Sequence, residues 1–229
     1  LFRSILDERV INSGYFVPSD GDTKGWQSAA ALARLAIAGG GAQFYGETKV
    51  INILTQNGQV AGVVTDRGTI HADNVLLCTN IWGPVFGDRA GVVLPLMAVE
   101  HQYLISEPLP ELAGETRFVA HPILRHQDER MYFRQHVDAY GIGSYNHEPL
   151  LVDPRDLGAT AENPFTPEHF DAACVAAETL LPALKDRRYV RQFNGMFTFT
   201  VDGYPILGES TLRGFWTAVG IWVTHSGGA

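Results

Sequence analysis

The sequence predicts an α/β protein, α+β overall, that joins part of a doubly wound domain to a separate antiparallel sheet. Three observations predict this fold class. The apolar run at 75–78 is continuous rather than alternating, which is typical of a strand covered on both faces. An Ala- and Leu-rich stretch at 27–38 ends at three glycines, as helices commonly do. From Leu94 onward, strand-like segments alternate with polar turns.

The sequence of the first fifth of the chain predicts a helix, a strand, a second helix and a further short strand. Residues 1–10 carry apolar side chains at helical spacing, and residues 14–18 predict a short strand. Residues 19–25 supply turn and N-cap residues for the helix at 27–38. A further short strand is expected at 43–45.

A β-hairpin and a buried strand follow. The segments 50–54 and 60–65 flank Asn57-Gly58, a pair that strongly favours a two-residue hairpin turn. Residues 69–71 form another arm, which leads into the strand at 75–78. Small and polar residues at 78–83 then leave a crevice. Because ligands of open α/β sheets bind outside the carboxyl ends of strands, we expect a cofactor there.

The second sheet is antiparallel, with polar turns between its strands. Its strands, and two that follow, are expected at 97–106, 122–125, 130–135, 140–145, 193–199 and 215–219. A helix is expected at 168–181. The predicted domains are 1–95, which is part of the doubly wound domain, 96–190, which is the antiparallel sheet, and 191–229, which returns to the first domain.

Composition excludes several classes of protein. The net charge is −8, which argues against a nucleic-acid surface, and no apolar run reaches the roughly 18 residues of a membrane span. Cys78 and Cys174 are far apart in the sequence, so we expect two free thiols. The eight histidines form no His-x-His pair and no helical i, i+4 pair, and no metal site is expected.

Residues 68–83 read G-T-I-x-A-D-x-V-L-L-C-T-N-x-W-G, after a hairpin with Asn-Gly. In this order they resemble the second half of the FAD domain of amine-oxidising flavoproteins. More narrowly, the chain is similar to the dimethylglycine and sarcosine dehydrogenase or oxidase group of the D-amino-acid-oxidase-like superfamily. The resemblance implies FAD as the cofactor and a Rossmann-like FAD-binding domain beside an antiparallel-sheet substrate domain.

The family carries a G-x-G-x-x-G fingerprint near its N-terminus, and this chain has none. Gly25 and the glycines at 39–41 suit a helix start and a helix C-cap instead. The chain starts at Leu1 and finishes Ser226-Gly-Gly-Ala229. The expectation is therefore a fragment with an incomplete FAD-binding domain, inactive when alone.

Two residues are the predicted catalytic pair. The stretches Glu100-His-Gln-Tyr103 and Met131-Tyr-Phe-Arg134 resemble the family's substrate sheet, where a His and a Tyr lie over the flavin. They match His101 and Tyr132. A neutral imidazole can accept or relay the proton that a dialkylammonium must lose, and a phenol can fix an amine or carboxylate. Arg125 and Arg134 are candidates for holding the substrate carboxylate.

The predicted cofactor contacts lie at two other places. Val50 matches the position that the family lays against the adenine, although a hairpin valine also suits a core. The closing segment resembles the one along the flavin ring, ribityl chain and pyrophosphate, and a helix start suits an anionic group. Its predicted contacts are Trp222, Val223, Thr224, His225 and Ser226. The turn at 202–209 resembles the family's D-G-x-P-x-x-G-E turn.

The resemblance implies FAD-dependent oxidative demethylation of N-methylated glycines, with hydride transfer from the N-methyl carbon. Another amino-acid or amine oxidase of the superfamily stays open, as does a non-catalytic truncated subunit. A folate-binding domain and an electron-transfer flavoprotein are possible partners of such an enzyme. The expected compartment is the bacterial cytoplasm or the mitochondrial matrix.

Overall fold

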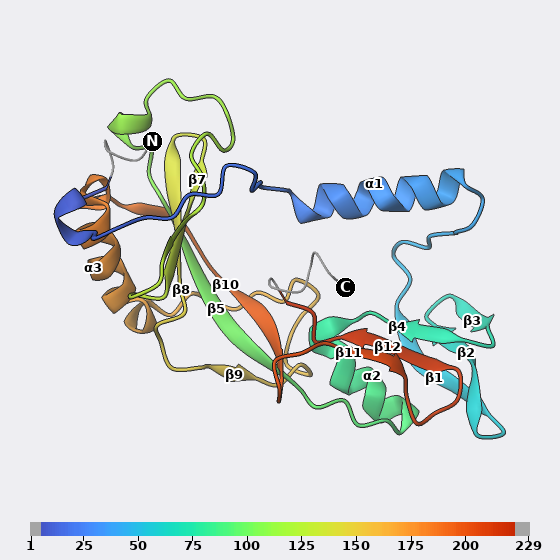
Figure 1. Cartoon of the computed structure of the whole chain (residues 1–229). Helices are drawn as coiled ribbons and strands as arrows, with labels where there is room; N and C mark the ends of the chain where they lie inside the picture. Colours follow the sequence, from blue (N-terminus) through green and yellow to red (C-terminus); the bar gives the residue numbers. More distant parts are fainter. Residues whose placement is uncertain (1–5, 223–229) are drawn as a thin grey trace. The chain divides into compact units, whose positions relative to one another are not determined.

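The structure is a computed structural model that describes residues 6–222 (Figure 1). The chain divides into two compact units. The first comprises residues up to 32, 101–149 and 162–195, and the second comprises 33–100, 150–161 and the residues from 196 onward. Together they form a mixed α/β fold with antiparallel sheets, which confirms the predicted fold class. The expected domain limits stay a prediction.

A six-stranded sheet dominates the first unit, in the order β10-β5-β8-β7-β6, with β9 paired to β5. Its strands are β5 (Leu96–Ser106), β6 (Leu124–His126), β7 (Met131–His136), β8 (Ala139–Ser144), β9 (Leu151–Val152) and β10 (Tyr189–Thr200). Strands β5 and β10 continue into the second unit, and β9 belongs to it. The four expected strands of the second sheet are thus confirmed, and the order inserts β8 between β5 and β7.

The two faces of this sheet differ, as strand alternation predicts. Met131 and Phe133 join the core that α3 (Asp171–Leu180) covers (Figure 1). Tyr132 and Arg134 alternate with them and occupy the opposite face. The helix brings small residues to the sheet, and the buried core is completed by Leu104, Ile142, Ala173, Ala177 and Leu180. One face of the sheet is therefore core, and the other is left for polar and aromatic groups.

The second unit holds two three-stranded sheets, β1-β2-β3 and β11-β12-β4. Their strands are β1 (Val50–Gln56), β2 (Gln59–Thr65), β3 (Gly68–His71), β4 (Val75–Leu77), β11 (Ile206–Glu209) and β12 (Phe215–Val219). Asn57 and Gly58 turn the hairpin with φ of 52° and 75°, as the pair predicts. Strands β12 and β4 are parallel, and their carboxyl ends therefore lie together.

The helices are few and short. They are α1 (Gly25–Ala38), α2 (Gly83–Ala90) and α3, with 3-10 helices at Glu8–Val10, Asn80–Trp82, Pro110–Leu112, Pro167–His169 and Pro182–Leu184. Helix α1 confirms the helix predicted from the Ala-rich stretch at 27–38, and Gly40 follows its end at a φ of 70°. Helix α2 and strand β11 were not predicted. None of the helices within 6–222 is long and apolar enough to cross a membrane.

Three local predictions are wrong. The segments 14–18 and 43–45 form no strand, because neither pairs with a neighbouring strand and apolar sequence alone does not make a ladder. The helix expected at 1–10 lies half outside the described residues, and within them a 3-10 turn spans Glu8–Val10, so that prediction is not counted among the three. Strand β4 is not covered on both faces, since it lies at a sheet edge and Leu76 is 61% exposed.

Both cysteines are free, as expected. Cys78 is exposed just after β4, and Cys174 lies half-buried on α3, where burial raises the pKa of its thiol. The two residues belong to different units. No disulfide therefore constrains either unit.

Candidate active site

The predicted pair meets on the open face of the six-stranded sheet. His101 Nε2 and the Tyr132 hydroxyl lie 2.9 Å apart, a hydrogen-bonding distance. His101 lies on β5 and Tyr132 on β7, and β8 separates these strands. The hydrogen bond therefore crosses over an intervening strand. Only the sheet order brings together two residues that are 31 positions apart in the chain.

Glycines on β8 make this crossing possible. Gly143 pairs with Tyr132 on one side and with Tyr103 on the other. A Cβ at Gly143 would lie 2.1 Å from Cζ of Tyr132, and one at Gly141 would lie 1.8 Å from the Tyr103 hydroxyl. The two tyrosine rings thus occupy the space that side chains of β8 would fill. The alternating glycines Gly141 and Gly143 are the sequence signal for this feature, which our sequence predictions missed.

A second tyrosine-histidine pair continues the same face. The Tyr103 hydroxyl lies 3.0 Å from His136 Nε2, again between β5 and β7. The rings of Tyr103 and Tyr132 stack with centroids 5.9 Å apart, and Phe193 packs on Tyr103 at 5.4 Å. Tyr103 follows His101 by two residues, so period-2 alternation alone would have placed it on this face.

Burial keeps these groups in their neutral forms. It lowers the pKa of His101 to about 3, with a smaller contribution from His147, and lowers that of His136 to about 4. Burial also raises the pKa of Tyr132 well above its ordinary range, and that of Tyr103 to about 12. His101 is only 8% exposed. At neutral pH these two tyrosine-histidine pairs therefore form an uncharged hydrogen-bonding surface.

The neutral His101 predicts an acid-sensitive fold. Between pH 6.5 and about 3 the unfolded chain binds a proton that the folded chain does not. His101 thus does not weaken folding above pH 6.5, but the free energy of unfolding falls as the pH drops below it. From pH 7 to pH 5 we expect the parental protein to lose about 2 kcal/mol more than His101→Gln. Urea unfolding at both pH values measures this, and equal losses would contradict it.

The two candidate arginines have different surroundings. Arg134 Nη2 donates to Asp22 Oδ2 at 2.7 Å, so Arg134 already pairs with an internal carboxylate. Arg125 pairs with no carboxylate among the described residues, and its Cζ lies 5.9 Å from the Tyr132 ring and 5.8 Å from the Tyr145 ring. Arg125 is therefore the better placed of the two to hold a substrate carboxylate.

The geometry can be compared with known proteins. The family description "DAO: FAD dependent oxidoreductase" matches residues 3–229. This chain belongs to the DAO family of FAD-dependent oxidoreductases. The recognised resemblance and the cofactor class that it implied are thereby confirmed.

Curated relatives and solved structures agree with this membership. The chain is 30% identical to 4-methylaminobutanoate oxidase (formaldehyde-forming) of Paenarthrobacter nicotinovorans, over 89% of the chain and 24% of that protein. It is 30% identical to human mitochondrial sarcosine dehydrogenase, over 90% of the chain and 22% of that protein. The chain thus spans about a quarter of the length of these relatives.

Among solved structures, L-proline dehydrogenase from P. horikoshii matches with a TM-score of 0.72 and 24% identity. That match covers 89% of this chain and 51% of the other. Glycine oxidase from Geobacillus kaustophilus matches with a TM-score of 0.67 and 23% identity, over 92% and 52%. At these identities the likeness shows the fold alone.

The DAO-family chain offers a polar strand end where part of FAD would fit. In the second unit, Asn80 accepts from the Ile221 backbone N–H at 3.0 Å and donates to the Ile221 carbonyl at 2.8 Å. This pairing fixes the ends of β4 and β12 beside each other. The Thr79 hydroxyl is buried there without a partner among residues 6–222. An unsatisfied hydroxyl at a parallel strand end suits a polar group of the cofactor.

The predicted cofactor residues are distributed over the second unit. Val50 opens β1, half-buried, and pairs with Thr65. Trp222 follows β12 and packs on Phe199 and Phe197, with ring centroids 4.9 and 6.0 Å apart. The other four predicted contacts, Val223, Thr224, His225 and Ser226, lie outside the described residues. Their roles, like those of His101 and Tyr132, stay predictions.

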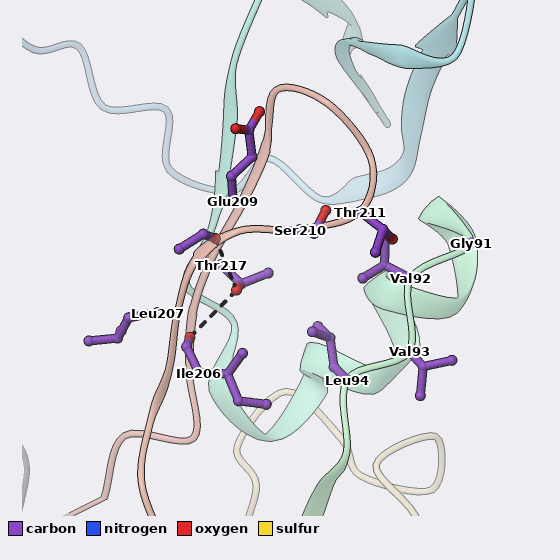
Figure 2. A pocket seen from close by; sticks show the side chains of 11 residues that line it. Gly91, Val92, Val93, Leu94, Ile206, Leu207, Glu209, Ser210, Thr211 and Thr217 are labelled. Carbon is purple, nitrogen blue, oxygen red and sulfur yellow. Dashed lines mark hydrogen bonds between the residues drawn. The ribbon is translucent and has the colours of Figure 1, made fainter.

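The second unit also contains a hollow of about 560 Å³. Figure 2 shows the loop 91–94 on one side and β11 on the other. The Thr217 hydroxyl in its wall is directed to the carbonyl oxygens of Ile206 and Gly208, at 3.5 and 3.4 Å. Its lining is largely apolar and holds no histidine or tyrosine. This hollow therefore lacks the chemistry of the His101–Tyr132 face, which belongs to the other unit.

Proposed function

We propose that the chain provides the substrate-binding face of an FAD-dependent enzyme that oxidatively demethylates N-methylated glycines. The observation that carries the proposal is the 2.9 Å hydrogen bond between His101 and Tyr132, beside Arg125, which pairs with no carboxylate within residues 6–222. Kinship with sarcosine and dimethylglycine dehydrogenases supports the same substrate class.

Each residue of the site has a separate role toward an N-methylglycine substrate. Bound FAD supplies the acceptor for the hydride that leaves the N-methyl carbon. Tyr132 directs its hydroxyl hydrogen to His101 Nε2, and its oxygen can accept a hydrogen bond from one of the two ammonium N–H groups of sarcosine, which leaves the other N–H for deprotonation. Arg125 binds the carboxylate. The oxidised substrate is an iminium ion, which water converts to formaldehyde and the demethylated glycine.

The position of Arg125 favours a short substrate. In an N-methylglycine one carbon separates the nitrogen from the carboxylate. Arg125 and Tyr132 pair directly across β6 and β7, so their side chains emerge next to each other. The longer 4-methylaminobutanoate would carry its carboxylate away from this arginine.

Anaerobic reduction of the flavin tests the function. The holoenzyme that contains this chain is mixed with dimethylglycine, sarcosine, 4-methylaminobutanoate, glycine and proline. We expect the N-methylglycines to bleach the flavin fastest and to release formaldehyde. Faster reduction by glycine or proline would instead support another oxidase of the superfamily.

Arg125 gives a separate prediction. Arg125→Met should raise the KM for dimethylglycine about 10- to 100-fold with little change in kcat, because a charge-assisted hydrogen bond contributes about 1.5 to 3 kcal/mol. Arg188→Met is the matched control, since Arg188 is exposed and pairs with Glu107. Steady-state kinetics measures both variants. An unchanged KM in Arg125→Met would contradict the carboxylate assignment.

A non-catalytic role is the second candidate. The chain is 28% identical to the mouse mitochondrial pyruvate dehydrogenase phosphatase regulatory subunit, over 95% of the chain and 25% of that protein. A regulatory subunit would bind a partner without oxidising an amine. The same experiment separates the two, because a holoprotein whose flavin no amine reduces would support this candidate.

A further inference from the structure

His147 lies at the edge of the aromatic face, three residues after β8 ends. Its ring centroid is 6.3 Å from that of His101. Its Nδ1 lies 2.9 Å from the carbonyl oxygen of Glu148. Because a carbonyl oxygen only accepts, Nδ1 carries the ring hydrogen. The Nε2 of the neutral ring is then a bare acceptor.

This Nε2 is buried and has no hydrogen-bond partner among residues 6–222. A buried acceptor without a donor costs about 1 to 3 kcal/mol and is uncommon in folded proteins. A bound molecule that presents an N–H would remove the cost. The unpartnered Nε2 of His147 therefore points to a ligand that carries an N–H group.

The ring beside His147 is that of His101, and neutral or cationic groups lie around His101 in turn. His101 on β5 is neutral, and so are Tyr132 on β7 and Tyr145, whose ring lies 4.7 Å from that of His101. Arg125 on β6 contacts the Tyr145 ring. Glu148, the next residue, is exposed. A substrate that brings its own carboxylate to Arg125 would place its ammonium among these rings.

We propose that His147 Nε2 takes the proton that the substrate ammonium must lose before its N-methyl carbon is oxidised. The inference rests on the proposed function. In this step the substrate N–H bond breaks and an Nε2–H bond forms. The positive charge moves to the imidazolium, whose Nδ1–H stays bonded to the Glu148 carbonyl. The nitrogen keeps the lone pair that hydride loss requires.

His101 is less suited to this step. Burial lowers its pKa to about 3, and its Nε2 is already bonded to Tyr132. The role of His101 is to orient the Tyr132 hydroxyl. The sequence pattern drew attention to His101 by resemblance, whereas nothing in the local sequence distinguished His147 from the other histidines.

Two substitutions at His147 separate proton transfer from hydrogen bonding. His147→Gln keeps an acceptor but cannot hold the proton, and His147→Leu removes both functions. At pH 7.5 we expect each variant to reduce its flavin with dimethylglycine about 10²- to 10⁴-fold more slowly than the parent. The deficit should shrink to under about tenfold at pH 10.5, because an alkylammonium such as that of lysine loses its proton near pH 10.4.

Anaerobic stopped-flow of the holoenzyme measures these rates. His71→Gln is the control, since His71 is exposed on β3, and it should keep the parental rate. A parental rate for His147→Gln at pH 7.5 would overturn the proton-acceptor role, as would a deficit that persists undiminished at pH 10.5.

A second measurement does not depend on the substrate. Histidine ¹⁵N NMR of the parental holoprotein, assigned through His147→Gln, should show a protonated Nδ1 and a bare Nε2 at pH 8. A protonated Nε2 would overturn the inference whatever the enzyme oxidises. If no amine reduces the parental flavin, the proposed function fails and the proton-acceptor role fails with it. The NMR result on the His147 tautomer does not depend on that outcome.

Discussion

His101→Ala is expected to slow reduction of the flavin by sarcosine about 10- to 100-fold, because His101 acts by orienting the Tyr132 hydroxyl. The substitution leaves the Tyr132 hydroxyl without its 2.9 Å partner on a buried face. A polar group stranded in this way costs about 1 to 3 kcal/mol. The phenol would turn to another partner and no longer hold the substrate nitrogen.

The pH dependence of this variant differs from what the sequence suggests. An ordinary histidine would add a limb near pH 6.5 to the rate profile. Because burial lowers the pKa of His101 to about 3, the parental profile should show no limb from His101 between pH 6 and 9. Any limb in that range should survive in His101→Ala.

Tyr132→Phe is the companion variant. It removes one hydroxyl and keeps the ring, so we expect a comparable loss of about 10- to 100-fold, equivalent to about 1.4 to 3 kcal/mol. Anaerobic stopped-flow measures both variants, after absorbance shows that each carries its flavin. His101→Ala with the parental rate from pH 6 to 9 would refute the placement of this pair at the substrate.

Gly143→Ala should slow flavin reduction by a similar factor, through a steric clash alone. Its Cβ would lie 2.1 Å from Cζ of Tyr132, far inside van der Waals contact. The ring must therefore leave its place over β8, and the hydrogen bond to His101 breaks. Overpacking of this kind also destabilises a fold by about 1 to 3 kcal/mol.

Gly195→Ala is the matched control. A Cβ at Gly195 would meet only the His101 carbonyl oxygen, at 3.8 Å, which is an ordinary contact. Flavin reduction and urea unfolding are compared for both variants. If Gly143→Ala retains the parental rate and stability, then β8 does not set the position of Tyr132.

Local sequence determined several elements by itself. Asn57-Gly58 fixed the hairpin because only a few residue types adopt two successive positive φ values readily. Alternation on β7 placed Tyr132 and Arg134 on one face, since side chains of a strand alternate strictly. The resemblance of the His-Gln-Tyr and Tyr-Phe-Arg stretches predicts His101 and Tyr132 as the catalytic pair, and this assignment stays a prediction.

Tertiary structure decided what those residues can do. The order β5-β8-β7 brings His101 across Gly143 to Tyr132, and pairing between distant strands is not encoded in either strand's own pattern. Asp22 pairs with Arg134, whereas Arg125 pairs with no carboxylate within the described part of the chain, although both arginines look alike in sequence. Burial depends on everything packed around a group. For that reason only the folded chain shows that burial lowers the pKa of His101 and that the Nε2 of His147 has no hydrogen-bond partner within residues 6–222.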